Sequence, residues 1–141
     1  MADTKSTRII YKSALAVFKD KKVLMVRDFT RPDVFLTLGG TVEDGETDID
    51  CLHREVKEEV GVGVKDGSLE FLEQFEAPAH GKSGARVNIR LFKGELAGEP
   101  VPSSEIVELQ YFDSSIEDRY INGNLVAQQI FVWLQQNNYI G

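Results

Sequence analysis

The amino-acid sequence predicts a mixed α/β fold in a single domain, on three observations. The chain has 141 residues, a length that suits one domain and is enough to bury a substantial core. Several short runs of apolar and β-branched residues, bounded by turn residues, are typical of β-strands. Among them, residues 47–61 combine helical apolar spacing with a polar start and a glycine end, which is typical of an amphipathic helix.

The first part of the chain predicts an arm followed by three strands. Residues 1–8 are polar and predict a flexible N-terminal arm, so that residues 9–141 form the domain. Residues 9–19, 23–26 and 34–38 are rich in apolar and β-branched side chains and predict strands. The third of these leads to the pair Gly39-Gly40, which predicts a tight turn because glycine tolerates positive φ and close backbone approach.

The next segment predicts one helix with defined ends. Thr47 is expected to cap its start with Asp50 as the capping-box partner, and Gly61 is expected to end it in the left-handed conformation. At about 100° per residue, four apolar side chains share one face of this helix. We expect that face to pack on the sheet through Ile49, Leu52, Val56 and Val60.

Three carboxylates occupy the neighbouring face of this helix. Glu55, Glu58 and Glu59 stand at i, i+3 and i+4, so their negative charges repel one another unless a cation binds there. Oxygen ligands of this kind suit hard divalent cations such as Mg²⁺ and Mn²⁺. The alternative is an ordinary acidic helix face in contact with solvent, and the three carboxylates by themselves favour neither interpretation.

The spacing of residues around this helix is more specific than its charge. Gly40 is followed after five residues by Glu46, and after seven more by residues 54–62, REVKEEVGV. This series resembles the Nudix box, G-x5-E-x7-R-E-U-x-E-E-x-G-U with U aliphatic, and every specified position is filled. The chain is therefore identified as a member of the Nudix hydrolases. That resemblance implies an α/β/α sandwich, in which a mixed β-sheet lies between helices.

The resemblance also implies the metal ligands. Glu55, Glu58 and Glu59 would hold Mg²⁺ or Mn²⁺, with the carbonyl of Gly39 as a further ligand and Gly40 beside the substrate. The cations would neutralise the diphosphate, whose negative charge otherwise repels the attacking water. A carboxylate would accept the proton of that water. Which glutamate does so varies across the family, and this stays open.

Two further positions of the box are assigned supporting roles by the resemblance. Arg54 would orient Glu55, since the guanidinium fork suits bidentate contact with carboxylates. Glu46 would fasten the preceding loop onto the helix. One position departs from the family pattern, because the residue before the glycine pair is Leu38 where proline is frequent.

The second half of the chain predicts a hairpin and a closing helix. Residues 69–76 and 86–95 alternate between apolar and polar side chains and predict two paired strands. Residues 107–112 predict another strand, and residues 113–118 a helical turn. Residues 125–136 carry apolar side chains at helical spacing and predict a helix that packs on the sheet.

Two residues between these elements are candidates for the site. His80, in the loop of the hairpin, would bind the substrate or else be an ordinary solvated side chain. Glu105 precedes the strand at residues 107–112, a segment from which several Nudix enzymes draw an extra acidic ligand. An exposed acid without a metal is the alternative for Glu105.

Composition limits the partners. The net charge of −7 argues against binding to nucleic acid, which depends on Lys and Arg at the phosphates. No apolar run approaches the roughly 20 residues that span a membrane. The single cysteine, Cys51, excludes an internal disulfide and fits a reducing cytoplasm. We expect Cys51 to be a small packing residue rather than a nucleophile, and the resemblance suggests a homodimer as one assembly.

The function implied is metal-dependent pyrophosphohydrolysis of a nucleoside diphosphate linked to another moiety. The short chain most resembles the branch that cleaves nucleoside triphosphates, including oxidised ones such as 8-oxo-dGTP, to monophosphate and pyrophosphate. ADP-ribose is the alternative substrate, because that branch has a proline about fifteen residues after the box and Pro78 lies sixteen after Val62. A domain that senses a nucleotide without cleaving it is the alternative of another class.

Overall fold

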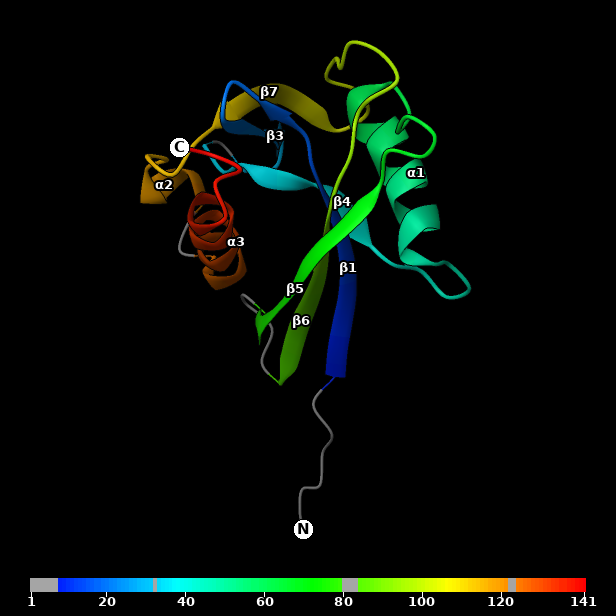
Figure 1. Cartoon of the computed structure of the whole chain (residues 1–141). Coiled ribbons are helices and arrows are strands. Elements are labelled where there is room, and N and C mark those ends of the chain that lie inside the picture. Colours follow the sequence, from blue (N-terminus) through cyan, green and yellow to red (C-terminus); the bar gives the residue numbers. More distant parts are fainter. Residues whose placement is uncertain (1–7, 32, 80–83, 122–123) are drawn as a thin grey trace.

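The computed structural model describes residues 8–31, 33–79, 84–121 and 124–141. Figure 1 shows the strands and helices, coloured along the sequence from the N-terminus to the C-terminus. The strands are β1 (Arg8–Ala16), β2 (Phe18–Lys19), β3 (Lys22–Asp28), β4 (Leu36–Thr41), β5 (Glu70–Pro78), β6 (Ala85–Lys93) and β7 (Ile106–Phe112). The helices are α1 (Asp48–Val60), α2 (Asp118–Ile121) and α3 (Leu125–Gln136).

The strands form one mixed sheet. Six of them lie in the order β2-β3-β4-β1-β6-β5, and β7 pairs with β3 beside this path. The pairing of β1 with β6 is parallel, whereas β1 with β4, β3 with its neighbours, and β5 with β6 are antiparallel. The predicted hairpin of two strands is thus confirmed, as is the mixed character of the sheet.

Helices cover the two faces of this sheet (Figure 1). On one face, Leu52 and Val56 of α1 belong to a buried cluster that includes Leu15 of β1. On the other face, Ile130 of α3 belongs to a second cluster that includes Ala14 of β1. Successive side chains of a strand point to opposite faces, so β1 supplies both cores. The α/β/α sandwich expected from the sequence is confirmed.

Helix α1 begins and ends where its sequence predicts. The Thr47 side chain accepts a hydrogen bond from the backbone N–H of Asp50, and the Asp50 carboxylate accepts one from Thr47. Gly61 adopts φ 74° and closes the helix. One of the four apolar positions was predicted wrongly, because the side chain of Ile49 is 48% exposed. Cys51, which was expected to be a small packing residue, is fully buried. Cys51 lies beneath the glycine pair, with Sγ 3.5 Å from the carbonyl oxygen of Gly40.

Several strand limits differ from the prediction for identifiable reasons. The segment predicted as one strand over residues 9–19 is broken between β1 and β2, because the chain leaves its partners β4 and β6 there and turns to pair with β3. Strand β4 begins later than predicted and continues through Gly39 and Gly40, which were expected to form a turn. Arg8, assigned to the flexible arm, is the first residue of β1, and the rest of that arm lies outside the described residues.

Near the C-terminal end of the chain, one helical turn lies later in the sequence than predicted. The helical turn predicted over residues 113–118 is found as α2, whose bounds are Asp118–Ile121. The closing helix has the predicted bounds and is capped by Asn124, whose side chain accepts a hydrogen bond from the N–H of Ala127. Within the part of the chain that the structure describes, no helix is long and apolar enough to cross a membrane.

Candidate active site

The glycine pair allows β4 to pass unusually close to its neighbours. Gly39 has φ +124°, and a Cβ atom there would lie 2.0 Å from the carbonyl oxygen of Ser13 in β1. At Gly40 a Cβ atom would lie 2.4 Å from Oε2 of Glu55 in α1. Real atoms never approach so closely, so neither position accepts a side chain without rearrangement. The two glycines therefore bring strand β1, strand β4 and helix α1 together at one point.

The side chain of Glu59 is held at this contact between β4 and α1 by a hydrogen bond. Its Oε1 accepts a hydrogen bond of 3.0 Å from the backbone N–H of Gly39. Burial raises the pKa of Glu59 to about 8, against the opposing effect of that hydrogen bond. The negative charges of Glu55, Glu58 and Asp28 contribute to this rise. A buried carboxylate among other carboxylates is a group that a divalent cation would stabilise.

Arg54 links the loop before α1 to the carboxylates. Its Nε and one terminal nitrogen donate to the two carboxylate oxygens of Glu46, at 2.7 and 2.9 Å. Its other terminal nitrogen donates to Glu55 Oε2 at 3.0 Å. Glu46 also accepts a hydrogen bond from the N–H of Glu43, and the Arg54 contact holds the pKa of Glu46 at about 2. Glu46 therefore stays ionised and keeps Arg54 against Glu55.

Glu55 and Glu58 complete the acidic group. Burial raises the pKa of Glu55 above its ordinary value, with Arg54 opposing and the charges of Glu58 and Glu43 adding to the rise. Glu58 is exposed on the outer side of the same helix. Within the described residues, no three acidic, histidine or cysteine side chains already surround one point as metal ligands. Glu55 is turned toward Arg54 instead, and Glu59 toward Gly39.

These residues nevertheless fit a divalent cation in their chemistry. All three glutamates offer oxygen atoms, which Mg²⁺ and Mn²⁺ prefer. The raised pKa values of Glu55 and Glu59 reflect burial together with mutual repulsion, which a bound cation removes. The predicted ligand set of Glu55, Glu58, Glu59 and the Gly39 carbonyl therefore stays a prediction that the donor chemistry supports.

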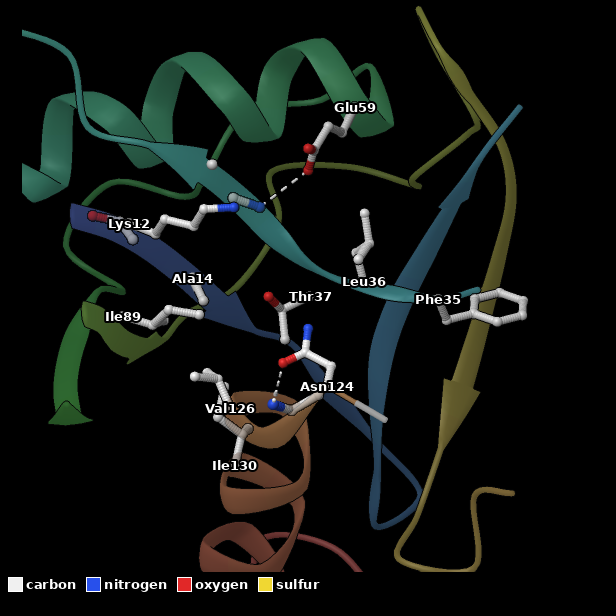
Figure 2. Close-up of a pocket in the computed structure, with 14 residues that line it drawn as sticks. Lys12, Ala14, Phe35, Leu36, Thr37, Glu59, Ile89, Asn124, Val126 and Ile130 are labelled. Atoms are coloured by element: carbon white, nitrogen blue, oxygen red, sulfur yellow. Dashed lines mark hydrogen bonds between the residues drawn. The ribbon is translucent and has the colours of Figure 1, made fainter. Parts of the chain in front are cut away.

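A pocket opens directly beside Glu59 and the glycine pair. Figure 2 shows it extending from Glu59 and Lys12 at one end to the first turns of α3 at the other. Its volume is about 120 Å³. The lining combines residues of β1, β4, α1, β6 and α3 with two residues that immediately precede β4 and α3: Lys12, Ser13, Ala14, Phe35, Leu36, Thr37, Gly39, Gly40, Glu59, Ile89, Asn124, Val126, Ala127 and Ile130.

The structure separates the other predicted site residues from this pocket. Glu105 lies in the exposed loop before β7, where its carbonyl accepts a hydrogen bond of 3.2 Å from the N–H of Phe29. Glu105 does not line the pocket, and its role as a ligand stays a prediction. His80 lies outside the described residues. Pro78 ends β5 opposite Arg86, at the end of the hairpin, and does not line the pocket either.

Sequence reasoning missed three residues of this region. Asp28, at the end of β3, contributes negative charge at Glu59 without belonging to the motif. Lys12 shares a face of β1 with Ala14, and a lysine at an inward-facing strand position was the available signal. Asn124 is the third, and the available signal was that an asparagine directly before an apolar helix is a typical N-cap.

The sequence of the chain is similar to those of known proteins. Residues 11–121 match the family model described as the NUDIX domain. The chain is 32% identical over 117 residues to the ADP-ribose pyrophosphatase of Methanocaldococcus jannaschii, covering 79% of this chain and 68% of that protein. It is also 42% identical over 86 residues to the NAD-capped RNA hydrolase NudC of Deinococcus radiodurans. That second match covers 60% of this chain and only 28% of the relative.

Solved structures resemble the whole fold. The solution structure of the E. coli ORF135 protein superimposes with a TM-score of 0.72 and covers 96% of this chain and 97% of that one. Sequence identity in this pair is 20%, so the likeness concerns the fold alone. It agrees with the sandwich of a mixed sheet between helices described above.

Proposed function

The chain belongs to the Nudix hydrolases, and from this premise we propose that it is a divalent-metal-dependent pyrophosphohydrolase acting on a nucleoside diphosphate linked to another moiety. One observation carries the proposal. Glu59 belongs both to the acidic group of α1 and to the wall of the pocket between the sheet and α3. A substrate whose diphosphate lies at the glutamates can thereby place its nucleoside in the pocket.

The residues of α1 are assigned roles that follow from their contacts. Glu55, Glu58 and Glu59 would hold Mg²⁺ or Mn²⁺, which when bound neutralises the charge of the diphosphate. Arg54 holds the carboxylate of Glu55 in place through the hydrogen bond from its terminal nitrogen. Glu46 fixes Arg54 by accepting from two of its nitrogens. Gly40 leaves the space that the Glu55 carboxylate occupies.

Two substrates remain candidates, and each has an observation in its favour. ADP-ribose is supported by the relative of M. jannaschii, whose name is ADP-ribose pyrophosphatase and which this chain matches over most of both lengths. We therefore propose ADP-ribose ahead of a nucleoside triphosphate, which the sequence alone had favoured. A nucleoside triphosphate is supported by the short chain of 141 residues, which most resembles the branch that cleaves nucleoside triphosphates. Pro78 gives no structural support to either substrate.

The test is product analysis with Mg²⁺ and with Mn²⁺ over a nucleotide panel. The panel contains ADP-ribose, unmodified and oxidised nucleoside triphosphates, NADH and diadenosine tetraphosphate. AMP and ribose 5-phosphate from ADP-ribose would support the first candidate, and pyrophosphate from a triphosphate the second. Glu58→Gln should abolish turnover without changing the thermal unfolding midpoint, because Glu58 is exposed. Glu95→Gln, which removes an exposed carboxylate outside α1 and outside the lining of the pocket, is the matched control.

A nucleotide sensor is the competing function. It predicts binding of a nucleotide from the panel without turnover in either metal, and with no effect of Glu58→Gln on binding by the metal-free protein. The complete set of box carboxylates, Glu46, Glu55, Glu58 and Glu59, favours the hydrolase over this alternative. Turnover that needs the metal and disappears in Glu58→Gln would exclude the sensor.

A further inference from the structure

The pocket beside α1 has one charged end and one largely apolar end. Figure 2 shows Lys12 and Glu59 at the first end, and Val126 and Ile130 of α3 at the other. Ala14 and Ile89 lie between them on the sheet (Figure 2). A ligand that fits both ends must be amphipathic, with an anionic group at the first end and an apolar or aromatic ring at the second.

Lys12 is held at the charged end by the strand pairing. Its Cα pairs with that of Thr41, the residue that follows Gly40 in β4. Its side chain lies on the same face of β1 as Ala14, the face that points to α3. Figure 2 shows the amine of Lys12 directed toward the contact between Glu59 and Gly39. Among the described residues that line the pocket, Lys12 is the one cationic side chain and Glu59 the one carboxylate.

At the charged end of the pocket, negative charges of the protein would repel a phosphate, and a cationic side chain would offset that repulsion. The chain carries a net charge of −7, and Glu55, Glu58 and Asp28 all act on Glu59. A phosphate that enters here is repelled by each of these carboxylates. An ammonium group within the pocket offsets this repulsion and can donate a hydrogen bond to a phosphate oxygen. This ammonium group would act on the phosphate that lies inside the pocket.

We propose that Lys12 binds the phosphate attached directly to the nucleoside, and thereby makes the pocket selective for nucleotides over nucleosides. The proposal rests on the proposed function, since it places the nucleoside in the pocket and the diphosphate at its charged end. Lys12 then contacts the phosphate that stays on the nucleoside after cleavage, while the leaving group lies farther out. The role is the same for ADP-ribose and for a nucleoside triphosphate, because both carry that phosphate.

The experiment measures binding of cleavage products to the metal-free protein by calorimetry, in EDTA. AMP is compared with adenosine, and GMP with guanosine, so that neither base has to be assumed. Wild-type protein should bind one monophosphate at least about tenfold more tightly than its nucleoside, the effect of one hydrogen-bonded charge pair. Lys12→Met should remove that preference and leave the affinity for the nucleoside unchanged. Lys12→Arg should retain most of it.

The controls separate a local effect from a general one. Lys22→Met removes an exposed lysine at the start of β3 and should bind both ligands as the wild type does. Thermal unfolding midpoints establish that each variant is folded. With the substrate found in the panel, Lys12→Met should raise KM more than it lowers kcat, because the contact is present before and during the reaction.

Each result bears on the inference or on the proposed function separately. Equal affinities for monophosphate and nucleoside in the wild type, or an unchanged preference in Lys12→Met, would overturn the role of Lys12. Turnover that depends on Glu58 would still support the hydrolase in that case. A preference that is lost in Lys12→Met in a protein without turnover would support Lys12 and reject the hydrolase.

Discussion

Oε1 of Glu59 accepts a hydrogen bond of 3.0 Å from the backbone N–H of Gly39, which joins the last turn of α1 to strand β4. The bond favours the ionised carboxylate, whereas burial favours the neutral acid and is the larger effect, so that the pKa rises to about 8. The contact therefore fixes the position of a group that is mostly protonated at neutral pH in the absence of metal.

Metal binding should release a proton from Glu59. With a pKa of about 8, Glu59 is protonated at pH 7, and a cation must displace that proton to reach the carboxylate. We expect release of about one proton per protein at pH 7, and a metal affinity that rises with pH until about pH 8. Calorimetry with Mg²⁺ or Mn²⁺ in two buffers of different ionisation enthalpy measures the release, which Glu59→Gln should abolish. Equal heats in both buffers would contradict the prediction.

The same group should make the metal-free fold less stable as the pH rises. Below pH 4.5 Glu59 is neutral in both the folded and the unfolded chain, so its contribution to stability is complete. Between pH 4.5 and about 8 the unfolded chain ionises more readily, and that contribution is lost. Urea unfolding in EDTA should show this decline for the wild type, and Glu59→Gln should reduce it. An identical pH profile in both proteins would argue against the raised pKa.

The two glycines should fail in different ways when replaced by alanine. A Cβ at Gly39 meets the backbone oxygen of Ser13, and φ is +124°, so Gly39→Ala should cost about 2 kcal/mol or more of unfolding free energy. A Cβ at Gly40 meets the side chain of Glu55, which can turn away. Gly40→Ala should therefore lose most activity with a smaller loss of stability. Denaturant unfolding and turnover are measured together, with Gly63→Ala, where the added Cβ meets nothing within 4 Å, as control.

Arg54→Lys should weaken the site although the charge is kept. One ammonium group cannot donate both to the two oxygens of Glu46 and to Glu55, as the guanidinium does. We expect a loss of roughly 10- to 100-fold in turnover or metal affinity, as for other residues that position ligands. Turnover and a Mg²⁺ titration measure this effect. The control is Arg119→Lys, at an exposed ion pair, which should change neither turnover nor metal affinity. Wild-type activity in Arg54→Lys would show that the guanidinium of Arg54 is not required.

The capping box of α1 should contribute to stability rather than to chemistry. Thr47→Ala removes the acceptor for the N–H of Asp50 and should cost about 1 kcal/mol of unfolding free energy. Thr47→Ser keeps the hydroxyl and should restore most of it. Urea unfolding at fixed pH measures both variants. A loss in the serine variant equal to that in the alanine variant would mean that the hydroxyl is not what matters.

The acidic helix could be predicted in detail because its signals are local. The caps Thr47 and Gly61 set its ends, and the carboxylates and Arg54 are named by a motif of fixed spacing. Its one error is Ile49, which is 48% exposed although it was expected on the buried face. Cys51 was expected to be a small packing residue, and it is buried.

The pocket could not be predicted because its wall comes from five separate elements. Lys12 and Asn124 lie far apart in the sequence and line one pocket only because β1, β4 and the start of α3 come together in the fold. The glycine pair was expected to turn the chain, yet β4 continues through it, since the missing Cβ atoms let β4 run against β1 and α1. Whether a glycine pair turns the chain or continues a strand depends on the neighbouring strands in the sheet. The sequence of one segment does not identify those neighbours.

Strand β1 lies in the middle of the sheet, antiparallel to β4 on one side and parallel to β6 on the other. Arg8, at its start, pairs opposite Ala85, so β1 has an open edge until the chain has been synthesised through β6. An open central edge offers unpaired backbone groups to other chains. Completion of the sheet therefore waits for the hairpin of β5 and β6, and a chain cut short before that hairpin exposes its most central strand to aggregation.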